Sequence, residues 1–294
     1  MMIRTPKITK NPDLILTSDW HLREDTPICR TDDYYATQWR KVDFISELQK
    51  KYNCPVIHAG DLFDYWKPSP MLISDSLIHL PDNFHTVYGN HDLPQHNLEL
   101  AYKCGIYTLI QAGKINIKPI SRVAQVSWGE EIPKHGYTDI LLWHTSVYQT
   151  KENWMSEAGF NSAAKLLRKY SDYDLIVTGD NHKPFVEEYQ GRLLVNPGSI
   201  MRMDADQINH RPRVYLWFAD TNTVEPMYIP IENNVISREH LEIKQQRESR
   251  IDAFISKLDG DWSASMSFES NLLEFEKSNN IRKDIMDIVY KAIE

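Results

Sequence analysis

The sequence predicts an α/β protein with a small helical appendage at its C-terminal end. Short apolar runs rich in β-branched residues recur along the first two thirds of the 294 residues, and a clear helical pattern separates the first two of them. After about residue 232 the sequence becomes charge-rich and its apolar residues follow a helical spacing. We therefore expect a main domain at 1–232 and a mostly helical region at 233–294.

Apolar runs that end in polar residues predict the buried strands of the main domain. We expect strands at 14–17, 55–58, 85–88, 140–143, 175–178, 193–195 and 214–218. A helix is expected at about 33–51, because Trp39, Val42, Ile45 and Leu48 recur on one face.

Two further segments complete the expected elements of the main domain. A helix is predicted at about 161–170, with Asn161 or Ser162 as its N-cap. The stretch 113–128 has the alternation of an antiparallel meander, with Ile115, Ile117 and Ile120 on one side.

The C-terminal region predicts two helices, at about 237–258 and 281–293, separated by a break at Gly260-Asp261. These helices either pack on their own domain or form an appendage that caps a substrate or docks a partner. An amphipathic helix laid in a partner's groove is a common recognition mode.

Polar motifs follow five of the expected strands, in a fixed order along the chain. They are Asp19-Trp20-His21, Gly60-Asp61-Leu62-Phe63-Asp64, Gly89-Asn90-His91-Asp92, His144 and Gly179-Asp180-Asn181-His182. Ligands of α/β proteins collect at the carboxyl ends of strands. Each motif alone is compatible with a solvated turn or a buried histidine, but their joint order predicts one shared site.

The residue types in these motifs are those that hold two adjacent divalent metal ions. Carboxylates, imidazoles and one amide supply oxygen and nitrogen ligands, which suit manganese best and also iron or zinc. Thiolate ligation is not expected, because Cys29, Cys54 and Cys104 have no paired spacing. They are expected to be free thiols in a reducing compartment.

Charge and hydropathy limit the possible partners. The net charge of −8 opposes general attraction to nucleic acid, although two divalent cations would add about +4 in the cleft itself. The basic residues near the motifs are candidates for contacts with backbone phosphates: Lys67, Arg202, Arg211 and Arg213. No apolar stretch spans a bilayer and no signal peptide begins the chain, so we expect a cytoplasmic protein without membrane contact, in a bacterium or a phage-infected host.

The motif set resembles the calcineurin-like metallophosphoesterase superfamily over about residues 13–218. That resemblance implies a β-sandwich flanked by helices (αββα). A finer similarity is to the SbcD-type DNA-repair nucleases and their phage members. It rests on Gly60-Asp61-Leu62-Phe63-Asp64 with Lys67-Pro68-Ser69-Pro70, on Gly89-Asn90-His91-Asp92, and on Asn196-Pro197-Gly198-Ser199.

The resemblance also implies a role for each motif residue. Asp19, His21 and His182 would hold the first metal, Asp61 would bridge, and Asn90 and His144 would hold the second. The last motif of the family usually reads Gly-His-x-His, and here Asp180 replaces its first histidine. Asp180 either binds the second metal or turns away in favour of a water molecule.

A proton donor is expected beside the metals. His91 would protonate the leaving oxygen, and Asp64 would orient it through the other ring nitrogen. Two metals would activate a water for in-line attack on phosphorus.

The implied function is a two-metal phosphodiesterase acting on DNA, an exonuclease of repair or recombination. The implied partners are DNA, an SbcC-type ATPase subunit and a second copy of the chain. A phosphodiesterase or phosphatase acting on a nucleotide or a lipid-linked sugar is the alternative. A non-catalytic scaffold of the same fold is a third reading, and only Asp180 favours it.

Overall fold

The computed structural model describes residues 10–116, 120–133, 138–149, 161–259, 268–279 and 281–291. The chain divides into two compact units, Met1–Arg238 and Glu239–Glu294. Within the described residues, no helix has the length and apolar character needed to cross a membrane.

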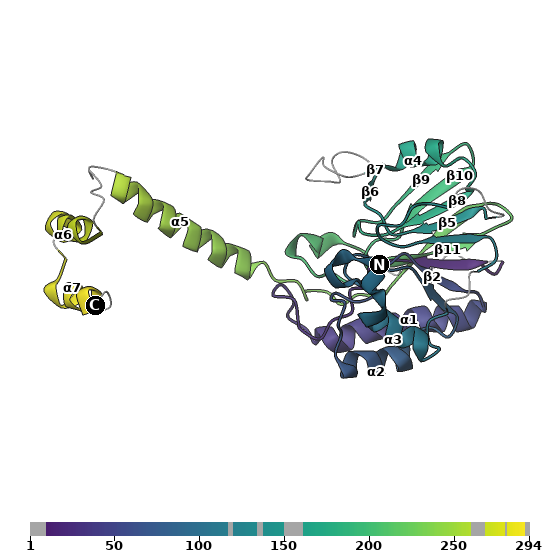
Figure 1. Ribbon diagram of the computed structural model, residues 1–294, viewed down its shortest axis with the longest axis horizontal. Coiled ribbons are helices and arrows are strands. Elements are labelled where there is room, and N and C mark those ends of the chain that lie inside the picture. Colours follow the sequence, from purple (N-terminus) through teal and green to yellow (C-terminus); the bar gives the residue numbers. More distant parts are fainter. Residues whose placement is uncertain are drawn as a thin grey trace. The chain divides into compact units, whose positions relative to one another are not determined.

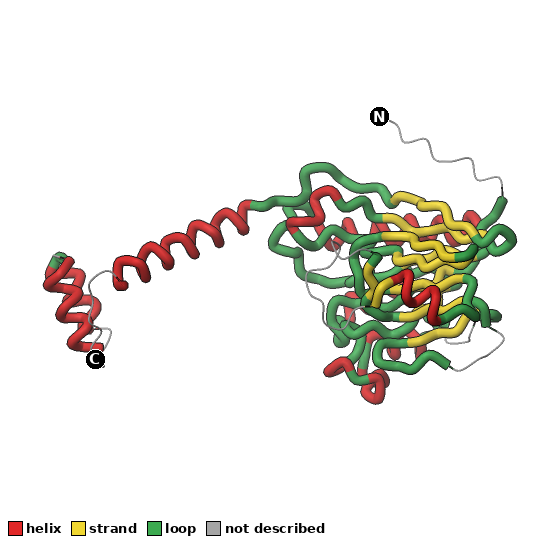
Figure 2. Tube along the Cα trace, turned by 90° about the horizontal axis from the view of Figure 1, so that it is seen from above, coloured by secondary structure: helices red, strands yellow, loops and turns green. Residues whose placement is uncertain are grey.

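Two five-stranded sheets form the centre of the first unit, and their strands lie side by side in Figure 2. The first sheet has the order β12 (Thr223–Tyr228), β11 (Arg213–Phe218), β1 (Leu14–Thr17), β2 (Val56–His58) and β3 (Phe84–Thr86). The second has the order β4 (Val123–Val126), β5 (Ile140–Trp143), β8 (Leu175–Thr178), β10 (Arg192–Asn196) and β9 (Phe185–Tyr189). A short pair, β6 (Val147–Tyr148) and β7 (Asn161–Ser162), lies outside them.

Parallel pairing dominates the middle of both sheets. Strands β1, β2 and β3 are parallel, as are β4, β5, β8 and β10. Strand β11 runs antiparallel to β1 and β12, and β9 runs antiparallel to β10. The parallel strands therefore send their carboxyl ends toward one edge of each sheet.

Helices cover the outer faces of the two sheets. They are α1 (Tyr34–Tyr52), α2 (Pro70–His79), α3 (Gly105–Gln111) and α4 (Ala163–Lys169), with 3₁₀ turns at Pro94–His96, Leu98–Lys103 and Ala205–Asn209. Figure 1 shows α1, α2 and α3 on the side of the first sheet and α4 on the side of the second. This αββα layering is the expected fold. The second unit consists of α5 (Glu239–Asp259), α6 (Phe268–Asn279) and α7 (Lys283–Lys291).

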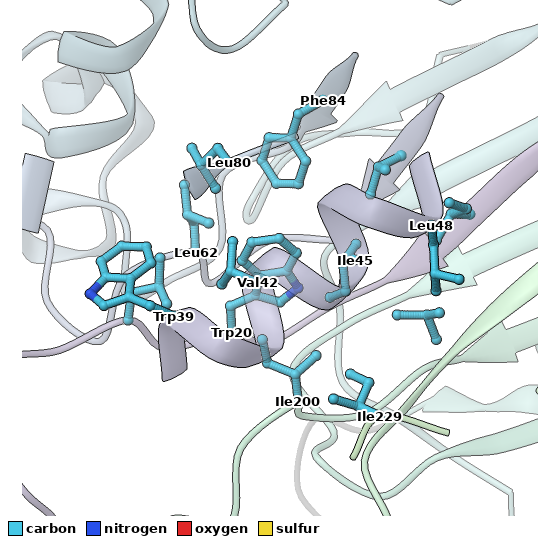
Figure 3. Packing of buried hydrophobic residues seen from close by; sticks show 14 of the residues in the cluster. Trp20, Trp39, Val42, Ile45, Leu48, Leu62, Leu80, Phe84, Ile200 and Ile229 are labelled. Carbon is cyan, nitrogen blue, oxygen red and sulfur yellow. The ribbon is translucent and has the colours of Figure 1, made fainter. Parts of the chain in front are cut away.

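Buried hydrophobic clusters lie on both faces of strand β1. Leu14 and Leu16 pack between the sheets, whereas Ile15 points the other way into the cluster beneath α1, because alternate strand residues face opposite sides. Figure 3 shows part of the cluster beneath α1, with Trp20 near Val42 of that helix. A third cluster lies beneath α4.

Local capping explains where two helices begin and where one ends. The Asp33 carboxylate accepts the Ala36 N–H at 3.0 Å and starts α1, and Asn53 in the left-handed conformation caps its C-terminal end. Ser69 caps α2 in the same way, with Pro70 in the first turn.

The structure corrects the expected meander at 113–128. Only β4 is a strand there, and it pairs in parallel with β5. Lys114 and Ile115 continue the turn that ends α3, because both N–H groups bond to the Leu109 carbonyl. Ile115 and Ile120 consequently pack into different clusters. The expected position of Ile117 and the break at Gly260-Asp261 lie outside the described residues.

Candidate metal centre

The five motifs meet at one edge of the sandwich, where strands of both sheets end. Asp19 and His21 follow β1, Asp61 follows β2, and Asn90 and His91 follow β3 in the first sheet. His144 follows β5, and Asp180 and His182 follow β8 in the second sheet. The site is thus assembled from two sheets.

The first group of candidate ligands is Asp19, His21 and His182. The Nε2 atoms of His21 and His182 are 3.0 Å apart. Burial lowers the pKa of His21 to about 4, so its imidazole is neutral at neutral pH. Asp19 is fully buried, and its Oδ1 accepts the Asp180 N–H at 2.8 Å. Its Oδ2 has no hydrogen-bond partner among the described residues and is available to a cation.

The second group is built around His144. Its Nδ1–H donates to the Ala59 carbonyl at 2.6 Å, which leaves the Nε2 lone pair facing the site. That Nε2 lies 3.0 Å from Asn90 Oδ1 and 3.4 Å from Asp61 Oδ2. Three electron-rich atoms that converge in this way favour a bound cation.

Asp61 lies between the two groups. Its Oδ2 is 3.4 Å from His144 Nε2 and 3.7 Å from His21 Nε2. Its Oδ1 accepts the His91 N–H at 2.9 Å. Burial and the neighbouring carboxylates Asp92 and Asp19 raise the pKa of Asp61 well above its usual value. A pair of divalent cations would relieve that accumulation of negative charge.

Asp180 reaches the same side of the site as His144. Its Oδ1 is 3.8 Å from His144 Nε2, and burial raises the pKa of the carboxyl group. The carboxylate is thus near the group that contains Asn90, but farther from the imidazole than Asp61 is.

The backbone at four of these residues is left-handed. Asp19, His21, Asp61 and Asp180 have φ values of 51°, 45°, 58° and 75°. Such conformations are unfavourable for residues with a Cβ and cluster at functional sites. The sequence offers no direct signal for them.

Glycine is required where the loops approach these ligands. A Cβ on Gly89 would collide with the Asp61 carboxylate, and one on Gly60 would collide with the His144 ring.

Asp92 has a role that the sequence reasoning missed. Its carboxylate is buried and accepts the N–H groups of Asp61 at 2.9 Å, Phe63 at 3.1 Å and Gly89 at 2.9 Å. It therefore joins the loop after β2 to the loop after β3. The available signal was its place at the end of Gly89-Asn90-His91-Asp92.

The expected pairing of His91 with the Asp64 carboxylate is corrected. His91 Nδ1–H donates instead to the main-chain carbonyl of Asp64 at 2.8 Å. The Asp64 carboxylate lies 3.4 Å from His21 Nδ1 and 3.1 Å from Arg23. The main-chain carbonyl and the side chain of Asp64 point in different directions, so either could have met His91. The sequence does not specify which of the two does.

His91 itself is exposed beside the ligands. Its ring meets that of His21 edge-on, with centroids 4.7 Å apart. Desolvation of the imidazole opposes its charged form, but Asp61 and the Asp64 carbonyl outweigh this effect and raise the pKa of His91 above its ordinary value.

Two cavities adjoin the site. One of about 380 Å³ is lined by Asp64 together with Arg23, Tyr65 and Lys67. The other, of about 370 Å³, is lined by Asp180, His182, His210 and residues of the 205–209 turn. Each offers space next to the ligands for part of a substrate.

The fold and this donor set define a metallophosphoesterase. Carboxylate, amide and imidazole groups converge without thiolates among the described residues, and the three cysteines are free, as expected, and also buried. The model of the calcineurin-like phosphoesterase superfamily domain matches residues 13–216, and the chain belongs to that superfamily. The superfamily uses a binuclear metal centre, which the donor set fits.

Solved structures similar to this chain include the following three. An archaeal phosphodiesterase is 15% identical, with a TM-score of 0.40, over 74% of this chain and 99% of its own. A metallophosphoesterase from Sphaerobacter thermophilus is 13% identical, with a TM-score of 0.37, over 74% and 89%. A Staphylococcus aureus protein described as a 5′-nucleotidase is 14% identical, with a TM-score of 0.42, over 80% and 58%. No curated protein matches the sequence.

Proposed function

We propose that this chain is a two-metal phosphodiesterase that hydrolyses DNA, an SbcD-type exonuclease of repair or recombination. The observation that carries the proposal is the exposed His91 imidazole, held by the Asp64 carbonyl next to the candidate ligands. A nucleotide leaves as an alkoxide, which needs a proton, and a positioned imidazole supplies one.

The proposed ligand set keeps the two groups described above. Asp19, His21 and His182 would hold one metal. Asn90, His144 and Asp180 would hold the other, and Asp61 would be a ligand of both. When bound, the metals supply Lewis-acid charge and lower the pKa of a water molecule. The number of oxygen donors favours manganese over iron or zinc.

The protein's own groups position the reaction. His91 Nε2 gives its proton to the leaving oxygen, while its Nδ1–H stays bonded to the Asp64 carbonyl. The Asp64 carboxylate, which also pairs with Arg23, orients the His21 ring from the side of its Nδ1. Asp92 keeps Asp61 and His91 on loops of fixed separation through its backbone hydrogen bonds.

The DNA substrate is supported by the Lys67-Pro68-Ser69-Pro70 loop, which lines the cavity beside Asp64. The helices of Glu239–Glu294 supply a surface for an SbcC-type ATPase partner, since Ile285 and Ile288 of α7 are exposed. A homodimer and a cytoplasmic location remain part of the proposal.

A small-molecule phosphodiesterase or phosphatase is the second candidate. Carboxylates line both cavities near the site, with Glu24 and Asp25 in one and Asp204 and Asp206 in the other. Together with the net charge of −8, these groups repel a polyanion more than a nucleotide.

Substrate comparison tests the proposal. Purified protein with Mn²⁺ is incubated with labelled single-stranded DNA, duplex DNA, nucleotides and bis-p-nitrophenyl phosphate, and Asp61→Asn serves as the metal-deficient control. The proposal requires release of nucleotides from DNA by the wild type alone. Cleavage of only the small diester or of nucleotides would establish the second candidate instead.

A further inference from the structure

A cavity of about 350 Å³ lies between the 3₁₀ turn at Ala205–Asn209 and the segment that follows β12. The charged side chains in its lining are two arginines, Arg202 and Arg211. The lining also contains His210, which is neutral at neutral pH because burial lowers its pKa to about 4. Three amides, Asn209, Asn233 and Asn234, add further hydrogen-bonding groups. The cavity contrasts with the two beside the metal ligands, which carboxylates line.

Arg202 is the buried member of this lining, with 5% of its surface exposed. Its terminal nitrogens donate to the carbonyls of Glu232 at 2.6 Å and Ile208 at 3.5 Å. Its Nε has no hydrogen-bond partner, and no carboxylate forms an ion pair with it, among the described residues. A buried guanidinium without a counter-charge of its own is costly.

More positive charge lies directly behind Arg202. Arg30 donates to the Arg202 carbonyl at 2.9 Å, and Lys41 donates to the Ile200 carbonyl at 2.7 Å. Both side chains are buried, and the carboxylate that opposes this group is Asp32, which Arg30 already binds through two nitrogens. Even with Lys41 neutral, two buried guanidinium groups share one carboxylate.

From the unbalanced charge and the basic lining, we propose that this cavity is a binding site for a phosphate group. A phosphate offers several acceptor oxygens and a charge that complements Arg202 and Arg211, and guanidinium groups bind it in a directed way. Arg211 is exposed and sits at the cavity, so it can meet an incoming anion.

The site is connected to the metal centre through His210. His210 Nε2 is 2.8 Å from the Ser199 carbonyl, and the Ser199 N–H donates to the carbonyl of His182. His210 also lines the cavity that contains His182 and Asp180. The phosphate can therefore come from a strand whose neighbouring phosphodiester is at the metals, or from free phosphate or a nucleotide.

Binding is tested first on the metal-free protein, where the proposed function plays no part. Orthophosphate is titrated calorimetrically in the presence of EDTA at constant ionic strength. The wild type is expected to bind it, and Arg211→Gln to bind it at least about tenfold more weakly. Arg168→Gln is the matched control, because Arg168 is also exposed and stacks on a tyrosine, Tyr189, but does not line the cavity.

The result that overturns the proposal is an absence of phosphate binding by the wild type, or equal binding by Arg211→Gln. Arg202→Gln provides a second test where circular dichroism shows that it folds, and it must weaken phosphate binding as well. Because Arg211 is exposed, Arg211→Gln is expected to fold. It therefore tests the proposal even if Arg202→Gln is unfolded.

The source of the phosphate is identified by steady-state kinetics with Mn²⁺ present. This second experiment rests on the proposed function. If a substrate strand fills the cavity, Arg211→Gln lowers kcat/KM for a short oligonucleotide about tenfold more than for bis-p-nitrophenyl phosphate. Equal effects on both substrates assign the site to free phosphate or a nucleotide. If the wild type does not cleave DNA, the proposed function fails while the calorimetric result for the cavity stands.

Discussion

Among the individual residues, Asp64 contacts two functional parts of the site through different atoms. Its main-chain carbonyl accepts the His91 Nδ1–H, and its carboxylate faces His21 and Arg23. One residue thereby supports both the candidate proton donor and a candidate metal ligand. The two roles can be separated, because a side-chain substitution leaves the carbonyl in place.

His91→Asn is expected to keep both metals and to lose between about 100-fold and 10,000-fold of kcat on a dinucleotide, because the leaving alkoxide then lacks its acid. The measurements are steady-state kinetics and elemental analysis of the purified variant. The loss should be much smaller with bis-p-nitrophenyl phosphate, whose leaving group needs no proton. Equal losses on the two substrates would show that His91 is not the acid.

Asp64→Asn is expected to weaken Mn²⁺ binding by between about tenfold and 100-fold, because it removes the carboxylate that orients His21. Isothermal titration calorimetry measures the affinity. Asp25→Asn is the control, since Asp25 also pairs with Arg23 but is not among the neighbours of His21. Unchanged Mn²⁺ affinity combined with a lowered kcat would place the Asp64 carboxylate on His91 instead.

Among the elements, helix α1 is tied to the loop that follows β10 through a buried lysine. Lys41 donates to the Ile200 carbonyl, and burial, followed by the charges of Arg30 and Arg202, lowers the pKa of Lys41 to about 7. Its ordinary value is 10.5. Between these two values the unfolded chain binds more protons than the folded chain, so this lysine makes stability rise with pH.

Lys41→Met is expected to remove that contribution. The free energy of unfolding, measured by urea denaturation across about pH 7 to 9, should rise more steeply with pH in the wild type than in the variant. Lys50→Met is the control, because Lys50 is an exposed residue of the same helix. Identical pH dependence in the wild type and Lys41→Met would mean that Lys41 is charged in the folded protein.

For the molecule as a whole, stability and chemistry are concentrated in the first of its two units. The three buried hydrophobic clusters consist of residues between Leu14 and Ile229, and all candidate ligands lie in the same unit. The unit Glu239–Glu294 contributes no residue to these clusters among the described residues.

A chain ending at Arg238 is therefore expected to fold and to hydrolyse bis-p-nitrophenyl phosphate with a kcat within about twofold of the full chain. Thermal unfolding and steady-state kinetics check this, with the full-length protein as the reference. The proposed partner surface would be lost with the helices. Failure of the shortened chain to fold would show that α5, α6 or α7 completes the core of the first unit.

Most strands and the positions of the candidate ligands at their ends could be predicted from sequence because both depend on local pattern. Apolar runs such as 14–17 and 175–178 are buried on both faces, and the polar motifs follow where the runs end. Helices α2, α3 and α6 were not predicted, although Ser69 and Pro70 carry the capping signal of α2. The exposed edge strand β12, which contains Pro226, has no such apolar run.

What the sequence determined was the superfamily, the order of the strands along the chain and the residues that gather at their ends. The tertiary structure decided which of these atoms meet. Contacts between the two sheets, such as Asp180 N–H with Asp19 and His144 with Ala59, join residues at least 85 positions apart. No local pattern encodes such a distance or a side chain's direction, so the partners of Asp64, the role of Asp92 and the basic cavity around Arg202 required the folded chain.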